Sequence, residues 1–200
     1  MRLVTVGVGA ANSPRYAPAG LLLASGGIRI MFDGGPGAEP IGRLDAWLVT
    51  DEQAELMSAI RHLAREHGLQ PYAGRFGKGR LRIENKPVVH TNHPAYGYVI
   101  TSGRRKVVWA PEFLRFPRWA RGADLMFAEA SGWNRPIRFA GGVGGHLDAL
   151  TVAEEARRSG VRRLIFAHIG RPTIRALDQG ERPPFGEFGE DGRTYRVLGA

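Results

Sequence analysis

The chain has 200 residues, a length that suits one domain and allows a core large enough to fold without covalent cross-links. It contains no cysteine, which excludes disulfides and thiolate metal sites and fits a reducing compartment. The formal charge of +9 comes almost entirely from arginines spread along the chain, so we do not expect a dedicated nucleic-acid surface.

Short strands dominate the first half of the chain. We predict strands at residues 2–6, 20–25, 28–32 and 46–49. The pair Gly26-Gly27 predicts a tight hairpin turn between the second and third of these strands. A helix is predicted over about residues 52–67, because Leu56, Ile60 and Leu63 recur at helical spacing.

The second half alternates strands with helices and glycine-rich loops. Further strands are predicted at residues 80–84, 88–91, 96–101, 106–109, 124–127, 163–167 and 194–198. Residues 132–145 and 171–191 predict loops, because glycine, proline and charged residues crowd both segments. A second helix is predicted at residues 152–159, with Thr151 and Glu154 spaced as a capping box at its start. Runs of strands with helices between them indicate β-sheets covered by helices.

Three polar residues near the ends of apolar segments are candidate site residues. Glu129 follows an apolar strand, where a buried carboxylate is costly without a partner, so we expect it to pair with His146. His146 itself follows a run of glycines that allows close approach of a ligand. His168 comes directly after an apolar strand, a common place for functional groups.

Seven segments, taken in order, resemble motifs of the metallo-β-lactamase superfamily, in particular its ribonuclease Z-like phosphodiesterase branch. They are Gly7-Val8-Gly9-Ala10-Ala11, Phe32-Asp33-Gly34-Gly35-Pro36-Gly37, residues 48–56, His90 with Tyr96-Gly97-Tyr98-Val99-Ile100, Val107-Val108-Trp109-Ala110-Pro111-Glu112, Asp124-Leu125-Met126-Phe127-Ala128-Glu129-Ala130-Ser131, and Gly145-His146 with Leu164-Ile165-Phe166-Ala167-His168. Each segment alone is weak, but their common order spans nearly the whole chain.

The resemblance implies an α+β fold over residues 1–200, an αββα sandwich in which two packed mixed β-sheets are flanked by helices. In that family, two divalent ions activate a water molecule for hydrolysis. Carried over by motif, the metal ligands would be His90 (with His93 as the alternative), Glu112 in place of the bridging aspartate, and His168. Glu129 and His146 would be the catalytic pair that protonates the leaving group.

The first metal motif departs from the family pattern. Where the family has His-x-His-x-Asp-His, this chain has Asp51, Gln53, Glu55 and Leu56. If Asp51 and Glu55 serve as ligands, the set is rich in oxygen and favours manganese, iron(II) or magnesium over zinc. The alternative is that these residues only begin the helix, with Thr50 and Gln53 as a capping box, and that no metal is bound.

The function that the resemblance implies is metal-dependent hydrolysis of a small phosphodiester-like substrate. One alternative is a non-catalytic family member that has lost its metals and acts as a binding or scaffold protein. Another is a cofactor-biosynthesis protein of the pyrroloquinoline quinone type, which Trp109-Ala110-Pro111-Glu112 also resembles. With no apolar run of the roughly 20 residues that cross a membrane, we expect a cytoplasmic protein with a small-molecule substrate and no membrane partner, and homodimer formation is left open.

Overall fold

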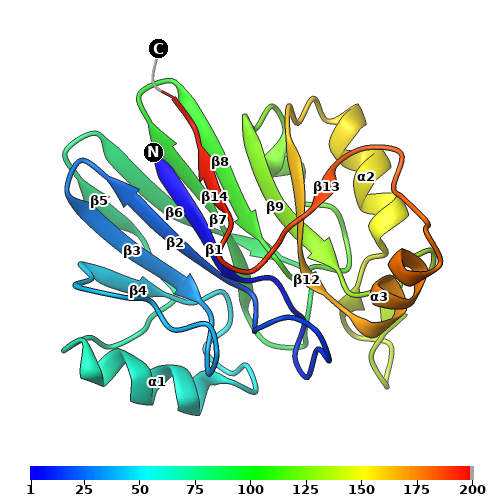
Figure 1. The fold of residues 1–200 in the computed structure, drawn as a ribbon, viewed down its shortest axis with the longest axis horizontal. Coiled ribbons are helices and arrows are strands. Elements are labelled where there is room, and N and C mark those ends of the chain that lie inside the picture. Colours follow the sequence, from blue (N-terminus) through cyan, green and yellow to red (C-terminus); the bar gives the residue numbers. More distant parts are fainter. Residues whose placement is uncertain (199–200) are drawn as a thin grey trace.

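The computed structural model describes residues 1–198 and consists of two β-sheets packed face to face (Figure 1). The first sheet contains β1 (Arg2–Gly7), β2 (Gly20–Ser25), β3 (Ile28–Asp33), β4 (Ala46–Leu48) and β14 (Thr194–Arg196), in the order β14-β1-β2-β3-β4. The second contains β5 (Phe76–Lys78), β6 (Leu81–Val88), β7 (Ala95–Ser102), β8 (Arg105–Ala110), β9 (Leu125–Ala130), β12 (Leu164–Ile169) and β13 (Glu187–Phe188), in the order β13-β12-β9-β8-β7-β6-β5. Both sheets mix parallel and antiparallel pairs.

Helices cover the outer faces of the two sheets. They are α1 (Met57–Glu66), α2 (Ala149–Arg158) and α3 (Arg171–Asp178), with a short 3-10 turn at Arg118–Ala120. A two-stranded hairpin, β10 (Ile137–Arg138) and β11 (Gly145–His146), stands apart from both sheets. Figure 1 shows α1 at one end of the molecule and α2 and α3 at the other. The predicted αββα sandwich is therefore the observed architecture.

Alternation of side chains along the first sheet builds two apolar layers. Leu21 and Leu23 join the core between the sheets, whereas Leu22 joins the outer cluster that α1 covers. On the helix, Met57, Ile60 and Ala64 are the buried residues, spaced so that they share one face. The strands β9 and β12 are buried along their whole length, because one face meets the first sheet and α2 packs on the other.

Two predicted helix starts were wrong. The helix predicted from residue 52 begins only at Met57, because Thr50 donates both its N–H and its hydroxyl to Asp33 instead of capping a helix. The capping box of Thr50 and Gln53 is therefore not formed. Similarly, α2 begins at Ala149, where the Asp148 side chain accepts the Thr151 N–H at 3.0 Å. In both helices, the first residue is set by a hydrogen bond that the local sequence pattern did not predict.

Three other predicted elements differ in the structure. The strand predicted at residues 88–91 does not form, because β6 ends at Val88 and His90 lies in the following loop. The loop predicted at residues 132–145 contains the strands of the β10–β11 hairpin. The loop predicted at residues 171–191 contains α3 and β13. Pro172 fits the first turn of α3, since proline needs no N–H acceptor there.

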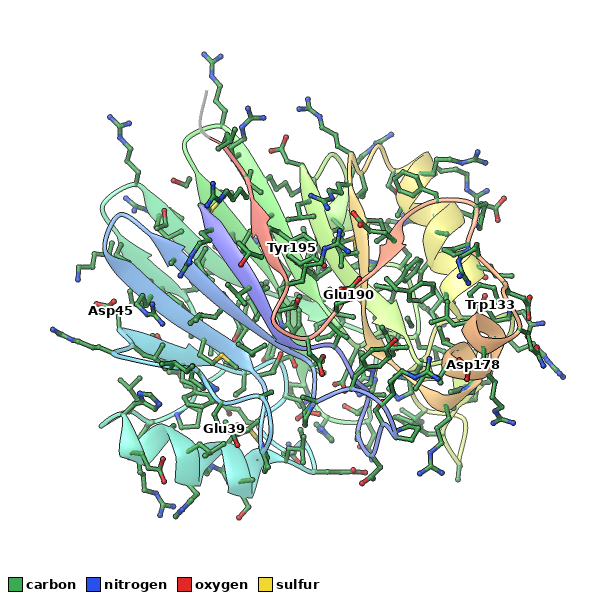
Figure 2. The ribbon with its side chains drawn as sticks, in the orientation of Figure 1. Glu39, Asp45, Trp133, Asp178, Glu190 and Tyr195 are labelled. Atoms are coloured by element: carbon green, nitrogen blue, oxygen red, sulfur yellow. The ribbon has the colours of Figure 1, made fainter. Side chains whose placement is uncertain are left out.

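The end of α3 is held against the loop that follows β1. Arg15 in that loop donates to both carboxylate oxygens of Asp178, at 2.8 and 2.9 Å. Figure 2 labels Asp178 on α3 and Trp133 beside it. Trp133 donates its indole N–H to Glu181, just after the helix. Within residues 1–198, no helix combines the length and apolar character needed to span a membrane.

Candidate active site

A cavity of about 500 Å³ lies where loops from both sheets meet. The predicted site residues that line it come from widely separated segments: Asp51, Glu55, His90, Glu112, His146 and His168. Glu129 lies behind two of them, fully buried at the end of β9, and hydrogen bonds to both His146 and His168. The structure therefore brings all seven predicted residues to one place.

The Glu112 carboxylate lies between two imidazoles. Its Oε2 is 3.3 Å from Nε2 of His90, and its Oε1 is 2.6 Å from Nε2 of His168. Glu112 follows β8, and His168 lies near the end of β12 at a φ of +59°. That left-handed backbone conformation costs a residue with a side chain about 1–3 kcal/mol, and such strain is typical of functional positions. It accompanies an irregularity in the pairing of β12 with β9.

Glu129 has hydrogen-bond partners on both carboxylate oxygens. Oε1 accepts the Ser131 N–H at 2.8 Å and lies 3.3 Å from Nδ1 of His168. Oε2 accepts from Nδ1 of His146 at 2.7 Å and from the Phe113 N–H at 3.2 Å. The Ser131 hydroxyl lies 2.9 Å from the same Nδ1 of His168. Glu129 thus orients both imidazoles and is itself fully satisfied.

Burial and pairing shift the pKa values of this cluster strongly. Burial alone would raise the pKa of Glu129, but His146 and His168 outweigh it and hold the pKa at about 2. Burial opposes the charged form of His168, but Glu112 and Glu129 outweigh it and raise the pKa to about 10. The neighbouring imidazoles likewise hold the pKa of Glu112 well below its ordinary value despite burial. Without a bound ion, His168 is therefore an imidazolium between two carboxylates.

The metal-free protein is expected to lose stability as the pH rises from about 6.5 to about 10. The folded pKa of His168 is about 10 against an ordinary value of 6.5, so its contribution is complete below 6.5 and disappears as the pH passes through 10. Urea denaturation in the presence of a chelator at several pH values measures this. In His168→Gln, the free energy of unfolding should change less with pH. If it changes equally with pH in the two proteins, the raised pKa of His168 does not cause the loss of stability.

His90 is held by the β10–β11 hairpin. Its carbonyl accepts the Gly145 N–H at 2.7 Å, and its ring Nδ1 donates to the Gly145 carbonyl at 3.1 Å. A Cβ at Gly144 would lie 2.0 Å from the His90 carbonyl oxygen, so only glycine permits this approach. Phe139, from the same hairpin, packs edge-on against His90 and His146, with ring centroids 5.5 and 5.3 Å apart.

The altered motif forms a different set of contacts. Asp51 is buried, and its Oδ2 lies 2.8 Å from Nε2 of His93, while Oδ1 accepts the Gln53 N–H at 2.7 Å. Asp51 would have to give up its pair with His93 to bind a metal. Glu55 and Leu56 also line the cavity. Leu56 offers no donor atom where the resemblance places a histidine, so this side of the cavity is poor in ligands.

His90, Glu112 and His168 bring two imidazole nitrogens and one carboxylate into the cavity. Because Nδ1 of His90 and Nδ1 of His168 already face other partners, both Nε2 atoms are directed at Glu112, the orientation that metal-binding imidazoles need. Two imidazoles and one carboxylate are a set of donors that zinc, iron(II) and manganese all accept. Among the described residues, Glu129, His146 and His168 are the one group of three whose ligand atoms all lie within 4.8 Å of one another. We nevertheless favour the Glu112 set, whose side chains would have to move closer together around an ion, because the oxygens of Glu129 are already occupied by two backbone N–H groups and two imidazoles.

Sequence reasoning missed three residues of the site. Ser131 followed Glu129 in a recognised segment, but nothing local marked its contact with His168. Asp33 lay in a predicted turn, yet its carboxylate accepts from the Trp109 indole at 2.7 Å and from Thr50. Burial raises the pKa of Asp33 to about 7, although these hydrogen bonds oppose the shift. Phe139 was hidden in a segment predicted to be a loop. These roles depend on contacts between distant parts of the chain.

Comparison with solved structures shows what this arrangement resembles. The metallo-beta-lactamase fold protein YhfI from Bacillus subtilis is 17% identical, with a TM-score of 0.74 over 98% of this chain and 99% of that one. A diphosphatase of the PhnP family is 15% identical, with a TM-score of 0.75 over 98% of both chains. The short form of human tRNase Z (ELAC1) is 14% identical, with a TM-score of 0.74 over 99% of this chain and 100% of that one. No family model matches the sequence, and no curated protein matches it. On its architecture and on these similarities over nearly its full length, the chain has the metallo-β-lactamase fold.

Proposed function

We propose that this protein is a hydrolase that uses a single divalent ion to cleave a small phosphodiester-like substrate. The observation that carries the proposal is the convergence of two imidazole Nε2 atoms on the two oxygens of Glu112, beside the Glu129–His146 pair, in one cavity. His90, Glu112 and His168 would hold the ion. Asp51 and Glu55 line the same cavity and would be further oxygen donors.

A bound divalent ion would supply a Lewis acid and an activated water. The other roles fall to the side chains. Glu129 accepts a hydrogen bond from Nδ1–H of His146, so Nε2 of that ring is free to deliver a proton to the departing oxygen. The buried carboxylate of Glu129 fixes the orientation of that ring, as the acid of a catalytic triad does. Ser131 and Glu129 fix the ring of His168.

The size of the cavity and the similar structures support the substrate class. A volume of about 500 Å³ suits a small molecule. Two of the structures reported above are a diphosphatase and a tRNase. We favour the small substrate over RNA, because the arginines of this chain are spread along the sequence rather than gathered in one segment.

Metal loading combined with a turnover assay tests the proposal. We expect purified protein to take up one ion per chain, and manganese or iron(II) to support cleavage of bis(4-nitrophenyl) phosphate better than zinc does. His168→Gln should abolish ion uptake, whereas His62→Gln, an exposed histidine on α1, should leave it unchanged. Uptake of two ions per chain would contradict the single-ion assignment, and an ion-loaded protein without turnover would contradict the hydrolase.

One observation favours a second candidate, a non-catalytic binding protein. In the chain of contacts from His90 through Glu112, His168 and Glu129 to His146, each side chain is paired with the next. Such a cluster could persist as a structural network after the metals are lost. Both candidates predict that the paired cluster stabilises the fold, but the binding protein would take up no ion at micromolar metal. The loading experiment therefore separates the two candidates.

A further inference from the structure

Part of the cavity lining is apolar at the altered motif, where Leu56 stands at the position of a metal-binding histidine in the resembled motif. Leu56 and Pro18 meet over Gly35, where an added Cβ would lie 3.3 Å from Leu56 Cδ1 and 3.7 Å from Pro18 Cγ. Ile60 lies one helical turn beyond Leu56, to whose carbonyl it donates its N–H at 2.9 Å. Ala54 precedes them in the same wall. We call Pro18, Ala54, Leu56 and Ile60 the apolar wall.

The apolar wall belongs to the same cavity as the polar cluster. All four of its residues line that cavity together with Glu112, His146 and His168. Ile137 and Phe139 of the hairpin add further apolar surface, with Phe139 against the rings of His90 and His146. A ligand that reaches the imidazoles therefore also contacts hydrocarbon.

The charges along the cavity limit which ligand fits. Among the described residues that line it, Arg171 is the single arginine or lysine, whereas Asp33, Asp51, Glu55 and Glu112 are acidic. A ligand with several negative charges, such as an oligonucleotide, would find few partners there. A ligand with one phosphate-like group and one uncharged apolar group would match both the polar cluster and the apolar wall. The apolar group would add to the binding free energy in proportion to the apolar surface that it removes from water.

We propose that the apolar wall is a subsite for an aryl or branched alkyl group of the substrate, next to the position of the reacting phosphate. The inference rests on the proposed function for the identity of the phosphate, but the subsite itself is defined by Pro18, Ala54, Leu56 and Ile60. On this assignment, the histidine at the end of the metal motif has been replaced by a substrate contact at Leu56. The natural substrate would then be an ester of phosphate with a compact apolar alcohol or phenol.

Binding of two inert phosphonates tests the subsite without turnover. We expect manganese-loaded protein to bind phenylphosphonate at least about tenfold more tightly than methylphosphonate in calorimetric titrations, since even one methylene in an apolar pocket can give a tenfold difference. Leu56→Asn keeps the side-chain size but adds an amide, and it should bring the ratio close to one. Ala54→Asn provides a second variant should Leu56→Asn fail to fold. Ile41→Asn, at an exposed apolar residue outside the cavity, should leave the ratio unchanged.

The results of these titrations test the apolar subsite independently of whether the protein is a hydrolase. Equal affinities for the two phosphonates, or no binding of either, would overturn the subsite. So would a phenyl preference that survives both Leu56→Asn and Ala54→Asn, because the apolar group would then bind elsewhere. A phenyl preference that these variants remove, in a protein that cleaves no diester with any ion, would support the subsite and reject the proposed function.

Discussion

Replacing Glu129 with glutamine is expected to lower the free energy of unfolding by about 3–5 kcal/mol, the usual result of removing one partner from a buried ion pair. The carboxylate is fully buried and accepts from two backbone N–H groups and two imidazoles. Glutamine offers only one acceptor oxygen, so its amide N–H₂ would face donors, and the positive charge of His168 would lose a partner. Urea denaturation of the metal-free protein at neutral pH measures the difference.

Glu84 provides the matched control for this substitution. It pairs with Lys86 at 2.7 Å, but half of its side chain is exposed to solvent. Exposed ion pairs contribute about 0–1 kcal/mol, so Glu84→Gln should change stability little. If the two substitutions cost the same, the buried network around Glu129 does not stabilise the fold as the contacts indicate.

The order of motifs predicted which residues meet, because most of them lie at or just after strand ends. Glu112 follows β8, Glu129 lies near the end of β9 and His168 near the end of β12. These three strands run parallel and adjacent, so their carboxyl ends share one edge of the sheet. A sequence that places polar residues after successive apolar strands therefore predicts a common site even without knowledge of the side-chain contacts.

The sequence could not predict which local polar groups would be used for long-range contacts. Thr50 looked like a helix cap, but Asp33, 17 residues earlier, accepts both of its hydrogen bonds. Asp51 looked like a metal ligand or a charge at a helix start, but His93 pairs with it from a loop 42 residues later. Local propensities of about 1 kcal/mol are outweighed by such contacts once the sheets bring the loops together.

The helix α3 was missed for a different reason. Prolines, glycines and charges across residues 171–191 predicted a loop, and they outweighed the pattern of buried Thr173, Ile174 and Ala176. A proline in the first turn followed by this spacing is itself a helix signal. The missed element matters because Arg171 and Pro172, at its start, line the cavity beside His168.

Replacing His146 with alanine is expected to lower kcat about 10²–10⁴-fold for a diester with an alkyl alcohol as leaving group, the contribution typical of a positioned acid. The loss should be much smaller for a 4-nitrophenyl leaving group, because nitrophenolate departs without a proton. Only a residue that delivers the proton predicts this dependence on the leaving group. Turnover of the two substrates by the same ion-loaded variant measures it.

Ion content distinguishes this role from metal binding by His146. In the structure, Nδ1 of His146 is bound to Glu129, and the ring stacks on that of His168 with centroids 5.2 Å apart. If Glu112, His90 and His168 hold the ion, His146→Ala should retain it, as should His62→Ala on the exposed face of α1. Loss of the ion together with equal losses of turnover for both leaving groups would place His146 among the ligands, in the group it forms with Glu129 and His168. If His146→Ala retains the ion and its loss of turnover depends on the leaving group, His90, Glu112 and His168 bind the ion. His146, oriented by Glu129, then delivers the proton.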